Sequence, residues 1–432
     1  MNDQIIINIH QLGAIRNAKI TLNQFMIFSG ASGLGKSYAA MLVHFVYRVL
    51  TGEELEGFFR LRNASLSDLK RFDDVAKHEV YSCPSDDFIQ WINTRAQEYM
   101  KELLSFEDLN MDVSIEFNGL PQILRFYYNH TERINHKDEP NIEARGALSM
   151  NKSLFGGVSF PLSIVPQIQL DLFSTVLSGY LTDKFKIGFV GSTFFMPPSR
   201  GAVLQVPLDK QFKVFESTPM YAEFIEKFAN IRSYSPYTQK PIRTTRITDG
   251  RLEEKEGKLI YMTHDTPLPI SAAASSIKEI APFIIMAEKG FARYYSILFE
   301  EPESHLHPEM QNAVVDVMAQ MIEQGSHFQI TTHSDYVLRR INDLIYLHLL
   351  KEKWADAGKF SAFCEKYGLN ENIAINPSLI NAYFFKAEEG GLSSVIEQDL
   401  SDGVPFDTFE KMINKNFPIS TKIYEQFEEL RS

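Results

Sequence analysis

One short run of residues constrains the fold of this chain more than any other. It is the glycine-rich turn Gly30-Ala-Ser-Gly-Leu-Gly-Lys-Ser37, which follows the apolar segment 25–28 and precedes an apolar stretch that ends near Leu50. Backbone N–H groups in such a loop, together with the N-terminus of the next helix, form a cradle for phosphate groups. The order of strand, phosphate loop and helix therefore predicts an α/β nucleotide-binding fold.

Each residue type in this loop has a chemical reason. Glycines allow positive φ and let the backbone approach the phosphates closely. The amine of Lys36 can meet the β- and γ-phosphate oxygens, and the hydroxyl of Ser37 can ligate Mg²⁺. We therefore expect ATP and Mg²⁺ as cofactors. The expected ATP-binding residues here are Gly30, Ser32, Gly33, Leu34, Gly35, Lys36 and Ser37.

A second apolar segment, 294–299, ends in the adjacent acids Glu300 and Glu301. Glu300 is expected to hold Mg²⁺ directly or through water, and Glu301 to orient or deprotonate the attacking water. Neighbouring side chains on a strand point to opposite faces, so a turn at the strand end must bring both acids to the site. An acidic pair alone is usually a solvated strand end. The phosphate loop in the same chain favours the catalytic interpretation.

Histidines follow in two places. A third apolar segment, 328–332, comes one helix later and leads into His333, which we expect to contact the γ-phosphate or the attacking water. His305 and His307 would share one face of a strand, as a zinc pair does, but no third ligand stands at a suitable spacing. A loop role at a dimer interface is therefore favoured for these two.

Ser275 and Ser276 stand just before the apolar helix expected over 280–287. Serine is a preferred N-cap residue, so capping is one interpretation. In the other, the N-terminus of this helix meets the γ-phosphate of a nucleotide bound by a second subunit. The residues alone leave both open.

Composition excludes several classes of protein. The 432 residues carry 43 basic and 55 acidic side chains, a net charge of 43 − 55 = −12, which disfavours a protein that coats nucleic acid. Cys83 and Cys364 lie too far apart in the sequence to indicate a disulfide framework or a cysteine zinc site. No signal-peptide pattern opens the sequence, and no apolar run is long enough to cross a bilayer. We expect a soluble, cytoplasmic protein.

The order of these segments predicts a nucleotide-binding head that is split in sequence. We expect the head over 1–52 and 187–345, an inserted lobe over 53–186, and a small extension over 346–432. Expected elements are helices near 65–76, 86–104, 167–182, 217–231 and 308–324, a hairpin of 112–118 with 123–129, an exposed loop over 130–153, and a charged hairpin over 242–262 with Asp249-Gly250 as one turn signal.

This ordered set of motifs resembles the ABC-type ATPase heads of the RecF, SMC and overcoming-lysogenization-defect (OLD) group. GASGLGKS is similar to their Walker A motif, ILFEEPESHLHP to Walker B with the D-loop, and ITTHSDYVL to the switch-histidine segment. FFMPPSRG, with Arg200, is similar to a stretch that precedes the signature in the OLD branch, where Glu300 replaces the more usual Asp. The resemblance covers 1–50 and 187–345. It implies a P-loop NTPase head with a mixed β-sheet flanked by helices and an inserted α/β lobe.

The resemblance also implies how the site is completed. Two heads would sandwich two ATP molecules, with Ser275 or Ser276 acting in trans, so a homodimer or higher homo-oligomer is expected. The family usually has Gly after the paired serines, and this chain has Ile277. A side chain there would crowd the γ-phosphate, which leaves open a slow or partner-dependent hydrolysis. No Asp-x-Asp follows residue 345, so the Toprim nuclease of many OLD-type proteins is not expected.

Three functions stay open at this point. The layout resembles stand-alone AAA ATPase subunits of phage-defence systems such as PARIS, Septu or retron-associated modules, in which a separate protein is the effector. The favoured hypothesis is an ATP-hydrolysing sensor or scaffold for such a partner. The alternative is a DNA-repair or DNA-end-binding ATPase of RecF type, in which Lys240, Arg243 and Arg246 touch phosphates. The third is a nucleotide-gated binding module with little hydrolysis. The acidic balance favours a protein partner over nucleic acid, and no membrane partner is expected.

Overall fold

The computed structural model describes residues 3–66, 76–134, 142–151, 157–233, 242, 244, 247–263, 266–290, 294–354, 356–401, 403–405 and 422. The strands are β1 (Gln4–Leu12), β2 (Ile15–Thr21), β3 (Phe25–Gly30), β4 (His78–Pro84), β5 (Met111–Asn118), β6 (Ile123–Ile134), β7 (Ile142–Met150), β8 (Val158–Pro161), β9 (Ser192–Met196), β10 (Arg251–Lys255), β11 (Lys258–Thr263), β12 (Thr266–Pro269), β13 (Tyr295–Glu300), β14 (His327–Thr332), β15 (Ile380–Ala387) and β16 (Ser393–Glu397).

The α-helices are α1 (Lys36–Leu50), α2 (Leu55–Leu61), α3 (Ser85–Leu104), α4 (Val165–Lys184), α5 (Leu208–Phe215), α6 (Pro219–Ser233), α7 (Ser275–Lys289), α8 (Pro308–Glu323), α9 (Asp335–Lys353) and α10 (Ala357–Tyr367). Short 3-10 helices are η2 (Leu162–Ile164), η3 (Arg200–Gln205), η4 (Ile270–Ala272), η6 (Glu371–Ile373), η7 (Pro377–Leu379) and η8 (Glu389–Gly391). Within the described ranges, no helix has both the length and the apolar character needed to span a membrane.

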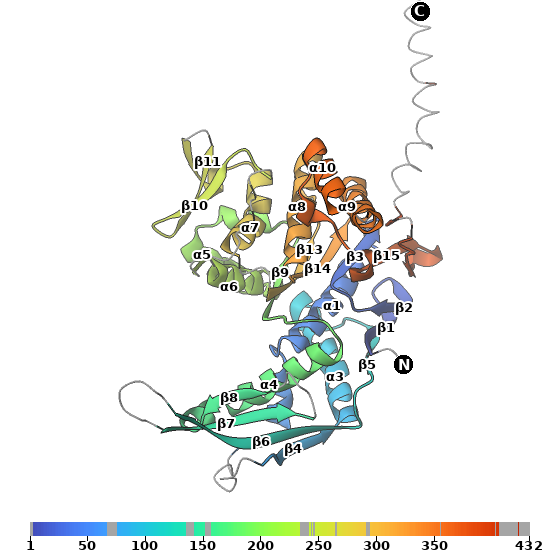
Figure 1. Cartoon of the computed structure of the whole chain (residues 1–432). Coiled ribbons are helices and arrows are strands. Elements are labelled where there is room, and N and C mark those ends of the chain that lie inside the picture. The colour runs from blue at the N-terminus through green and yellow to red at the C-terminus, as the bar shows by residue number, and fades with distance from the viewer. Residues whose placement is uncertain are drawn as a thin grey trace, which may run out of the picture.

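A mixed sheet of nine strands lies at the centre of the described part, in the order β5-β1-β2-β16-β15-β3-β14-β13-β9 (Figure 1). Strands β15, β3, β14, β13 and β9 run parallel to one another, while the pairs β1 with β2, β1 with β5, and β15 with β16 are antiparallel. Helices pack on both faces. The expected α/β fold, with a mixed sheet flanked by helices, is confirmed.

Strand β3 shows how the sheet divides the core. Phe25, Met26, Ile27 and Phe28 are all fully buried. Because side chains alternate across a strand, Met26 and Phe28 pack in the cluster that contains α1, and Phe25 and Ile27 pack in the cluster that contains α7, α8 and α9. A strand covered on both faces reads as a continuous apolar run, which is why its sequence shows no alternation.

A second, smaller body lies beneath the central sheet in Figure 1. Its antiparallel sheet has the order β4-β6-β7-β8 and packs against α2 and α4. Three aromatic rings join these layers: the ring centroids of Phe59 and Phe173 are 5.2 Å apart, and those of Phe126 and Phe173 are also 5.2 Å apart. This aromatic packing continues the core on the α1 face of the central sheet, because the side chains of the lobe belong to the same buried cluster.

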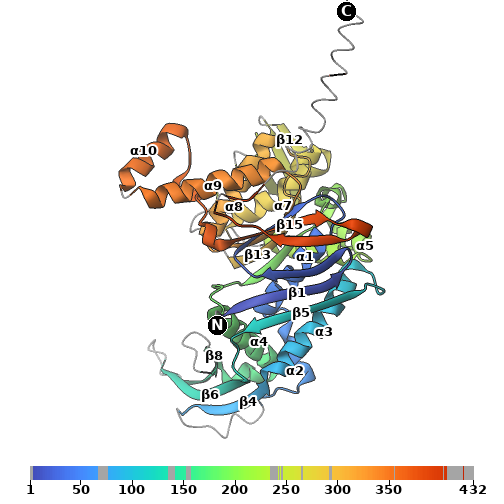
Figure 2. The same ribbon diagram turned by 90° about the vertical axis from the view of Figure 1, so that its right-hand side faces the viewer.

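Two expectations for the lobe are wrong. Strand β5 pairs with β1 in the central sheet (Figure 2), whereas β6 pairs with β4 and β7, so 112–118 and 123–129 form no hairpin. The expected loop over 130–153 contains the end of β6 and all of β7. Alternation indicates a strand, but tertiary packing chooses its partner. The helix expected near 65–76 lies mostly outside the described residues.

The C-terminal region also differs from the expected extension. Strands β15 and β16 lie between β3 and β2 inside the central sheet, and Tyr383 and Phe385 of β15 pack on Phe28 with ring centroids 5.8 and 6.2 Å away. We therefore propose that the head also includes β5, β15 and β16. The charged hairpin is β10 with β11, and it turns at Glu256-Gly257, whose φ values of 51° and 71° suit a two-residue turn.

A cluster of ion pairs holds the far end of α1. Arg48 lies 3.1 Å from Glu53, 2.7 Å from Glu54 and 2.7 Å from Glu223. Lys227 of α6 pairs with Glu53 at 2.7 Å. Burial works against ionisation of Glu223, but its contacts with His44 and Arg48 prevail and lower its pKa to about 2. The helix that begins at the phosphate loop is thus fixed to α6 by charge.

The same cluster reaches the lobe and the edge of the sheet. Arg95 of α3 pairs with Glu54 at 2.9 Å. Glu53 accepts a hydrogen bond from the backbone N–H of Thr193 at 2.9 Å, and Lys227 donates to the Thr193 carbonyl at 3.0 Å. Charged groups that are this well paired stabilise the contact between α1, the lobe and β9.

Burial of His327 predicts how stability depends on pH. Burial lowers the pKa of His327 to about 4, and its Nε2 atom lies 3.0 Å from the Ile187 carbonyl. The unfolded chain takes up this proton below pH 6.5 and the folded chain does not, so stability falls as the pH decreases from 6.5 to 4. Between pH 7 and 5 we expect the wild type to lose about 2 kcal/mol more free energy of unfolding than His327→Gln, measured by urea denaturation. Equal losses would refute this.

Candidate functional site

The register of three parallel strands brings the candidate residues to one edge of the sheet. Glu300 of β13 pairs with Thr331 of β14, and Thr331 and Thr332 pair with Phe28 and Ser29 of β3. Parallel strands end at the same edge, where ligands of open α/β sheets bind. The loop after β3, the acids after β13 and the histidine after β14 therefore meet there.

The phosphate loop has the backbone that its glycines predict. Gly30, Gly33 and Gly35 have φ values of 126°, 77° and 95°. A Cβ atom on Gly30 would lie 2.3 Å from the Phe385 carbonyl oxygen, and one on Gly35 would lie 2.7 Å from the Ile15 side chain. Only glycine fits at these two positions. Ser32 and Gly33 are exposed at the loop, and Leu34 is partly buried.

The amine of Lys36 lies folded over this loop. It donates hydrogen bonds to the carbonyls of Gly30 at 3.0 Å and Ala31 at 2.8 Å, and the residue is only 5% exposed. Burial lowers the pKa of Lys36 to about 8, although the nearby carboxylates, Glu301 foremost, act in the opposite direction. A buried cation bound only to carbonyls gains from an anionic partner, as a phosphate would be.

Ser37 and Glu300 form the candidate metal site. The Ser37 hydroxyl donates to Glu300 Oε2 at 2.9 Å, and Glu300 is 3% exposed. The other carboxylate oxygen, Oε1, is buried and has no hydrogen-bond partner. Burial, with help from the charge of Glu301, raises the pKa of Glu300 to about 7. A hydroxyl beside a buried, half-satisfied carboxylate is an oxygen donor set that suits Mg²⁺, so the residues fit this ion.

Glu301 is turned toward the site by an unusual backbone angle. Its φ is +43°, and its N–H donates to the Thr331 carbonyl at 3.0 Å. The carboxylate accepts a hydrogen bond from the Ser304 hydroxyl at 3.0 Å and lies 3.8 Å from His333 Nε2. Its side chain is 41% exposed. The strain of this backbone breaks the strand alternation, and the carboxylate is open to water.

His333 completes the group of expected catalytic residues. Burial lowers its pKa, and the positive charge of Lys36 adds to that effect, while Glu301 and the Gly30 backbone act in the opposite direction. A pKa below the ordinary value keeps the imidazole neutral at pH 7, so that it can both donate and accept a hydrogen bond.

Glu303 has a role that sequence reasoning missed. Its Oε1 atom accepts hydrogen bonds from the His333 backbone N–H at 2.7 Å and from the Thr332 hydroxyl at 3.0 Å. Burial raises the pKa of Glu303, and its Oε2 atom is buried without a partner. Glu303 therefore holds the backbone that presents His333. The sequence signal that could have identified Glu303 is a third acid close behind the acidic pair at the strand end.

Arg200, identified in the sequence only through a resemblance, is fully buried behind the two acids. Its guanidinium donates to the carbonyl of Glu300 at 2.8 Å and to that of Glu279 at 2.9 Å, and lies within 3.4 Å of the Glu301 carbonyl. It also lies over the ring of Phe299, 4.6 Å from the centroid. Burial lowers the pKa of Arg200.

Ser275 and Ser276 lie in the first turn of α7, and the structure does not use them as caps. The N-cap is Ala274, and no side chain caps the helix by a hydrogen bond, so the capping interpretation is wrong. Ser275 is exposed. Among the described residues, no hydrogen bond joins either serine to the phosphate loop of the same chain.

Ile277 does not face outward with the serines. It is 7% exposed and packs in the core cluster of its own head. The expectation that its side chain crowds a γ-phosphate is therefore not supported. His305 and His307 are both exposed, and the described ranges contain no group of three or more His, Cys, Asp or Glu side chains placed to hold a metal.

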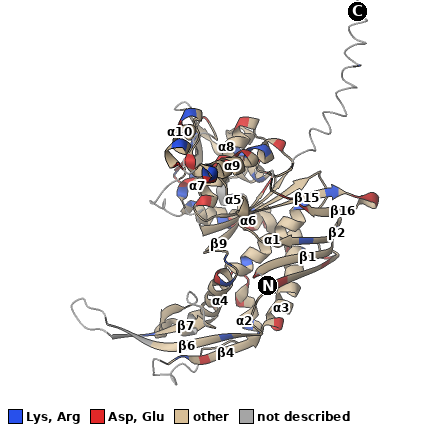
Figure 3. Ribbon diagram, turned by 45° about the vertical axis from the view of Figure 1, so that its right-hand side comes forward, with Lys and Arg blue, Asp and Glu red and all other residues tan. Residues whose placement is uncertain are grey.

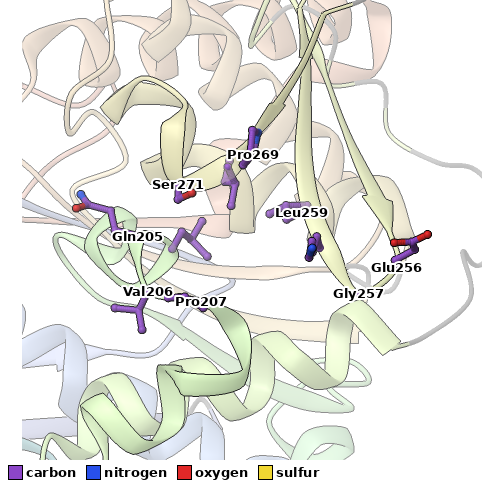
Figure 4. A pocket seen from close by; sticks show the side chains of 11 residues that line it. Gln205, Val206, Pro207, Glu256, Gly257, Leu259, Pro269 and Ser271 are labelled. Carbon is purple, nitrogen blue, oxygen red and sulfur yellow. The ribbon is translucent and has the colours of Figure 1, made fainter.

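A cavity of about 400 Å³ lies elsewhere on the head, between the β10–β11 hairpin and the 3-10 helices η3 and η4 (Figure 4). Its lining residues are Leu204, Gln205, Val206, Pro207, Glu256, Gly257, Lys258, Leu259, Pro269, Ile270 and Ser271. None of them belongs to the phosphate loop or to the acids. The cavity is therefore distinct from the candidate nucleotide site.

One family model matches part of the chain. Residues 207–338 match the family model described as the AAA ATPase domain. That range contains Ser275, Glu300, Glu301 and His333 but not the phosphate loop, which the fold itself brings to Glu300. A search of curated proteins finds no match to the chain.

Among solved structures, the chain is similar to SMC head domains. The head from Thermotoga maritima is 10% identical, with 92% of this chain and 100% of that chain covered and a TM-score of 0.31. An Smc head with an extended coiled coil, bound to a ScpA domain from Pyrococcus furiosus, is 11% identical with full coverage of both chains and a TM-score of 0.36. An SmcHead bound to the C-winged helix domain of ScpA is 11% identical, with 92% and 98% covered and a TM-score of 0.34. Such scores indicate a remote likeness.

The role of Glu303 predicts a difference between two substitutions. Glu303→Ala leaves the Thr332 hydroxyl and the His333 N–H without their acceptor, and it should lower the free energy of unfolding by about 1–3 kcal/mol. Glu303→Gln keeps an oxygen that accepts both bonds, so it should cost less than half as much. Thermal and urea denaturation of both variants measure this. A loss that is as large for Gln as for Ala would show that the hydrogen bonds to Oε1 are not what Glu303 contributes.

Proposed function

We propose that this chain binds and hydrolyses ATP as an ABC-type ATPase head and acts as a nucleotide-gated sensor or scaffold for a partner effector in the bacterial cytoplasm. The observation that carries the ATPase proposal is the contact of Ser37 with the buried Glu300 beside Lys36. The match to the AAA ATPase domain supports it independently.

The residues divide the work of hydrolysis among them. Lys36 exchanges its bonds to the Gly30 and Ala31 carbonyls for phosphate oxygens. Ser37 and Glu300 would hold Mg²⁺, which when bound supplies positive charge to the phosphate oxygens. Glu301, partly open to solvent, orients the attacking water and accepts its proton. Neutral His333, 3.8 Å from Glu301, holds the water or the γ-phosphate from the other side.

The site is completed by a second copy of the chain. Ser275 is exposed in the first turn of α7, where helix N–H groups attract anions. In the part of the chain that the structure describes, neither Ser275 nor Ser276 bonds to the loop of its own chain. These features support a homodimer, or a higher oligomer, in which α7 of one head meets the nucleotide of the other. Because Ile277 is buried in its own head, its side chain gives no reason to favour a binding module with little hydrolysis.

A role in anti-phage defence with a separate effector protein rests on the layout of the chain. It combines an ATPase head with an inserted lobe, carries a net charge of −12, and has no Asp-x-Asp after residue 345. For the alternative of a DNA-binding ATPase, Lys240, Arg243 and Arg246 lie outside the described residues. Charges of both signs are interspersed on α9 and α10 (Figure 3), which supports a protein surface rather than a phosphate track.

Glu301→Gln should trap an ATP-bound dimer. The amide cannot accept the proton of the water, so steady-state turnover should fall by about 100-fold or more, whereas ATP binding is retained. Size-exclusion chromatography with ATP and Mg²⁺ should then show a dimer. Lys36→Ala is the matched control, because it should lose both ATP binding and the dimer. Unchanged turnover in Glu301→Gln would remove Glu301 from its assigned role.

A plaque assay tests the defence proposal. Cells that express the chain with its neighbouring genes should resist phage, and Lys36→Ala should lose that protection because nucleotide no longer gates the partner. We expect plating efficiency to differ by about 100-fold or more between the two, because loss of ATP binding removes the ATP-bound state that controls the partner. Equal plating would overturn the defence role. ATP turnover that DNA stimulates, with a steep loss of stimulation in salt, would favour the alternative.

A further inference from the structure

Arg200 joins two parts of the head that face different nucleotides in the proposed dimer. One part is α7, whose first turn carries Ser275 and Ser276 and whose Glu279 carbonyl accepts a bond from Arg200 Nε at 2.9 Å. The other is the end of β13, where the carbonyls of Glu300 and Glu301 lie 2.8 and 3.4 Å from the guanidinium. A single planar group therefore spans both elements.

This connection is rigid. Arg200 is 0% exposed, lies over the Phe299 ring at 4.6 Å, and donates a further bond to the Pro197 carbonyl at 3.0 Å. The neighbouring backbone is equally close, because a Cβ atom on Gly201 would lie 2.8 Å from Glu279 Oε1. The planar fork of a guanidinium fixes the direction of each bond, which a lysine amine cannot do.

The geometry points to Arg200 as a positioning residue that couples the two ATP sites of the dimer. This inference rests on the proposed function. The serines of α7 engage the nucleotide of the partner head, whereas Glu301 acts on the nucleotide of its own head. A shift of α7 on meeting the partner's nucleotide is passed through the guanidinium to the backbone of Glu301. Each head then reaches its full rate of ATP hydrolysis only when its own α7 has also contacted the nucleotide of the partner head.

Mixing with inactive subunits tests this coupling. Wild-type chain is mixed with increasing fractions of Lys36→Ala chain, which binds no ATP and so cannot dimerise with itself, but presents α7 to the ATP of a wild-type head. A different affinity tag on each chain measures the mixed dimers that form. With coupling, an equal mixture should retain about one quarter of the activity, because both sites of a dimer must be filled. When Arg200→Lys is placed in both partners, the same mixture should retain about one half, because each site then works alone.

Two further variants keep the test sharp. Gly201→Ala keeps the guanidinium of Arg200 but displaces η3, which begins at Arg200, from Glu279, so it should shift the mixing curve in the same direction as Arg200→Lys. Arg340→Gln, which removes an arginine that pairs with Asp316 at 2.7 Å on α8 and α9, should leave the curve of the wild type unchanged. Binding of a fluorescent ATP analogue to each single variant should stay within about twofold of the wild type, since within the described ranges Arg200 makes no hydrogen bond to the phosphate loop.

The outcomes separate this inference from the proposed function. If the Arg200→Lys and Gly201→Ala mixtures follow the wild-type curve, or if the wild-type curve is itself linear while the tags recover mixed dimers, the coupling role is overturned. If either variant loses binding of the ATP analogue, Arg200 serves the nucleotide site and the inference fails as well. If the wild type does not hydrolyse ATP, or if Glu301→Gln forms no dimer with ATP, it is the proposed function that fails.

Discussion

Hydrogen bonding of β3 to β14 and of β14 to β13, all in parallel, is the constraint on which the rest of the site depends. The pairs Thr331 with Phe28 and Glu300 with Thr331 set the level at which the three strands end. A slip of one residue would turn Glu300 to the opposite face of the sheet, away from Ser37. Apolar side chains covered on both faces, such as Phe25 to Phe28, make that slip costly.

Near these strand ends, the site contains buried ionisable groups that lack well-matched partners. Glu300 and Glu303 have carboxylate oxygens without partners, and Lys36 is bound only to loop carbonyls. Buried charges of this kind cost stability unless they are paired. The well-paired cluster of Arg48, Glu53 and Glu223 lies at the other end of α1 and holds the helix in place. The charged groups at one end of α1 are therefore paired within the protein. Those at the other end lack partners of the kind that a phosphate and a cation would supply.

The sequence predicted the loops and strand ends that contain the site residues better than it predicted which residues and strands contact them. The loop before Lys36 and the acids after β13 have patterns that depend on neighbouring residues, so they could be found. Glu303 and Arg200 escaped a derived role because they act largely on backbone atoms, the His333 N–H and the carbonyls of Glu279 and Glu300, and no side-chain pattern marks those. The insertion of β15 beside β3 was missed for a similar reason. Strand pairing across more than 350 residues leaves no periodic signal in the sequence.

The contacts of Thr193 have a consequence for how copies of the chain can meet. Strand β9 ends the central sheet, and an open edge normally offers its N–H and C=O groups to any passing strand. Here the Glu53 carboxylate occupies the N–H of Thr193, and the Lys227 amine occupies its carbonyl. A second sheet would have to displace two charged groups to continue this one. At Thr193 this edge is therefore blocked to a further strand, which disfavours assembly by extension of the sheet here.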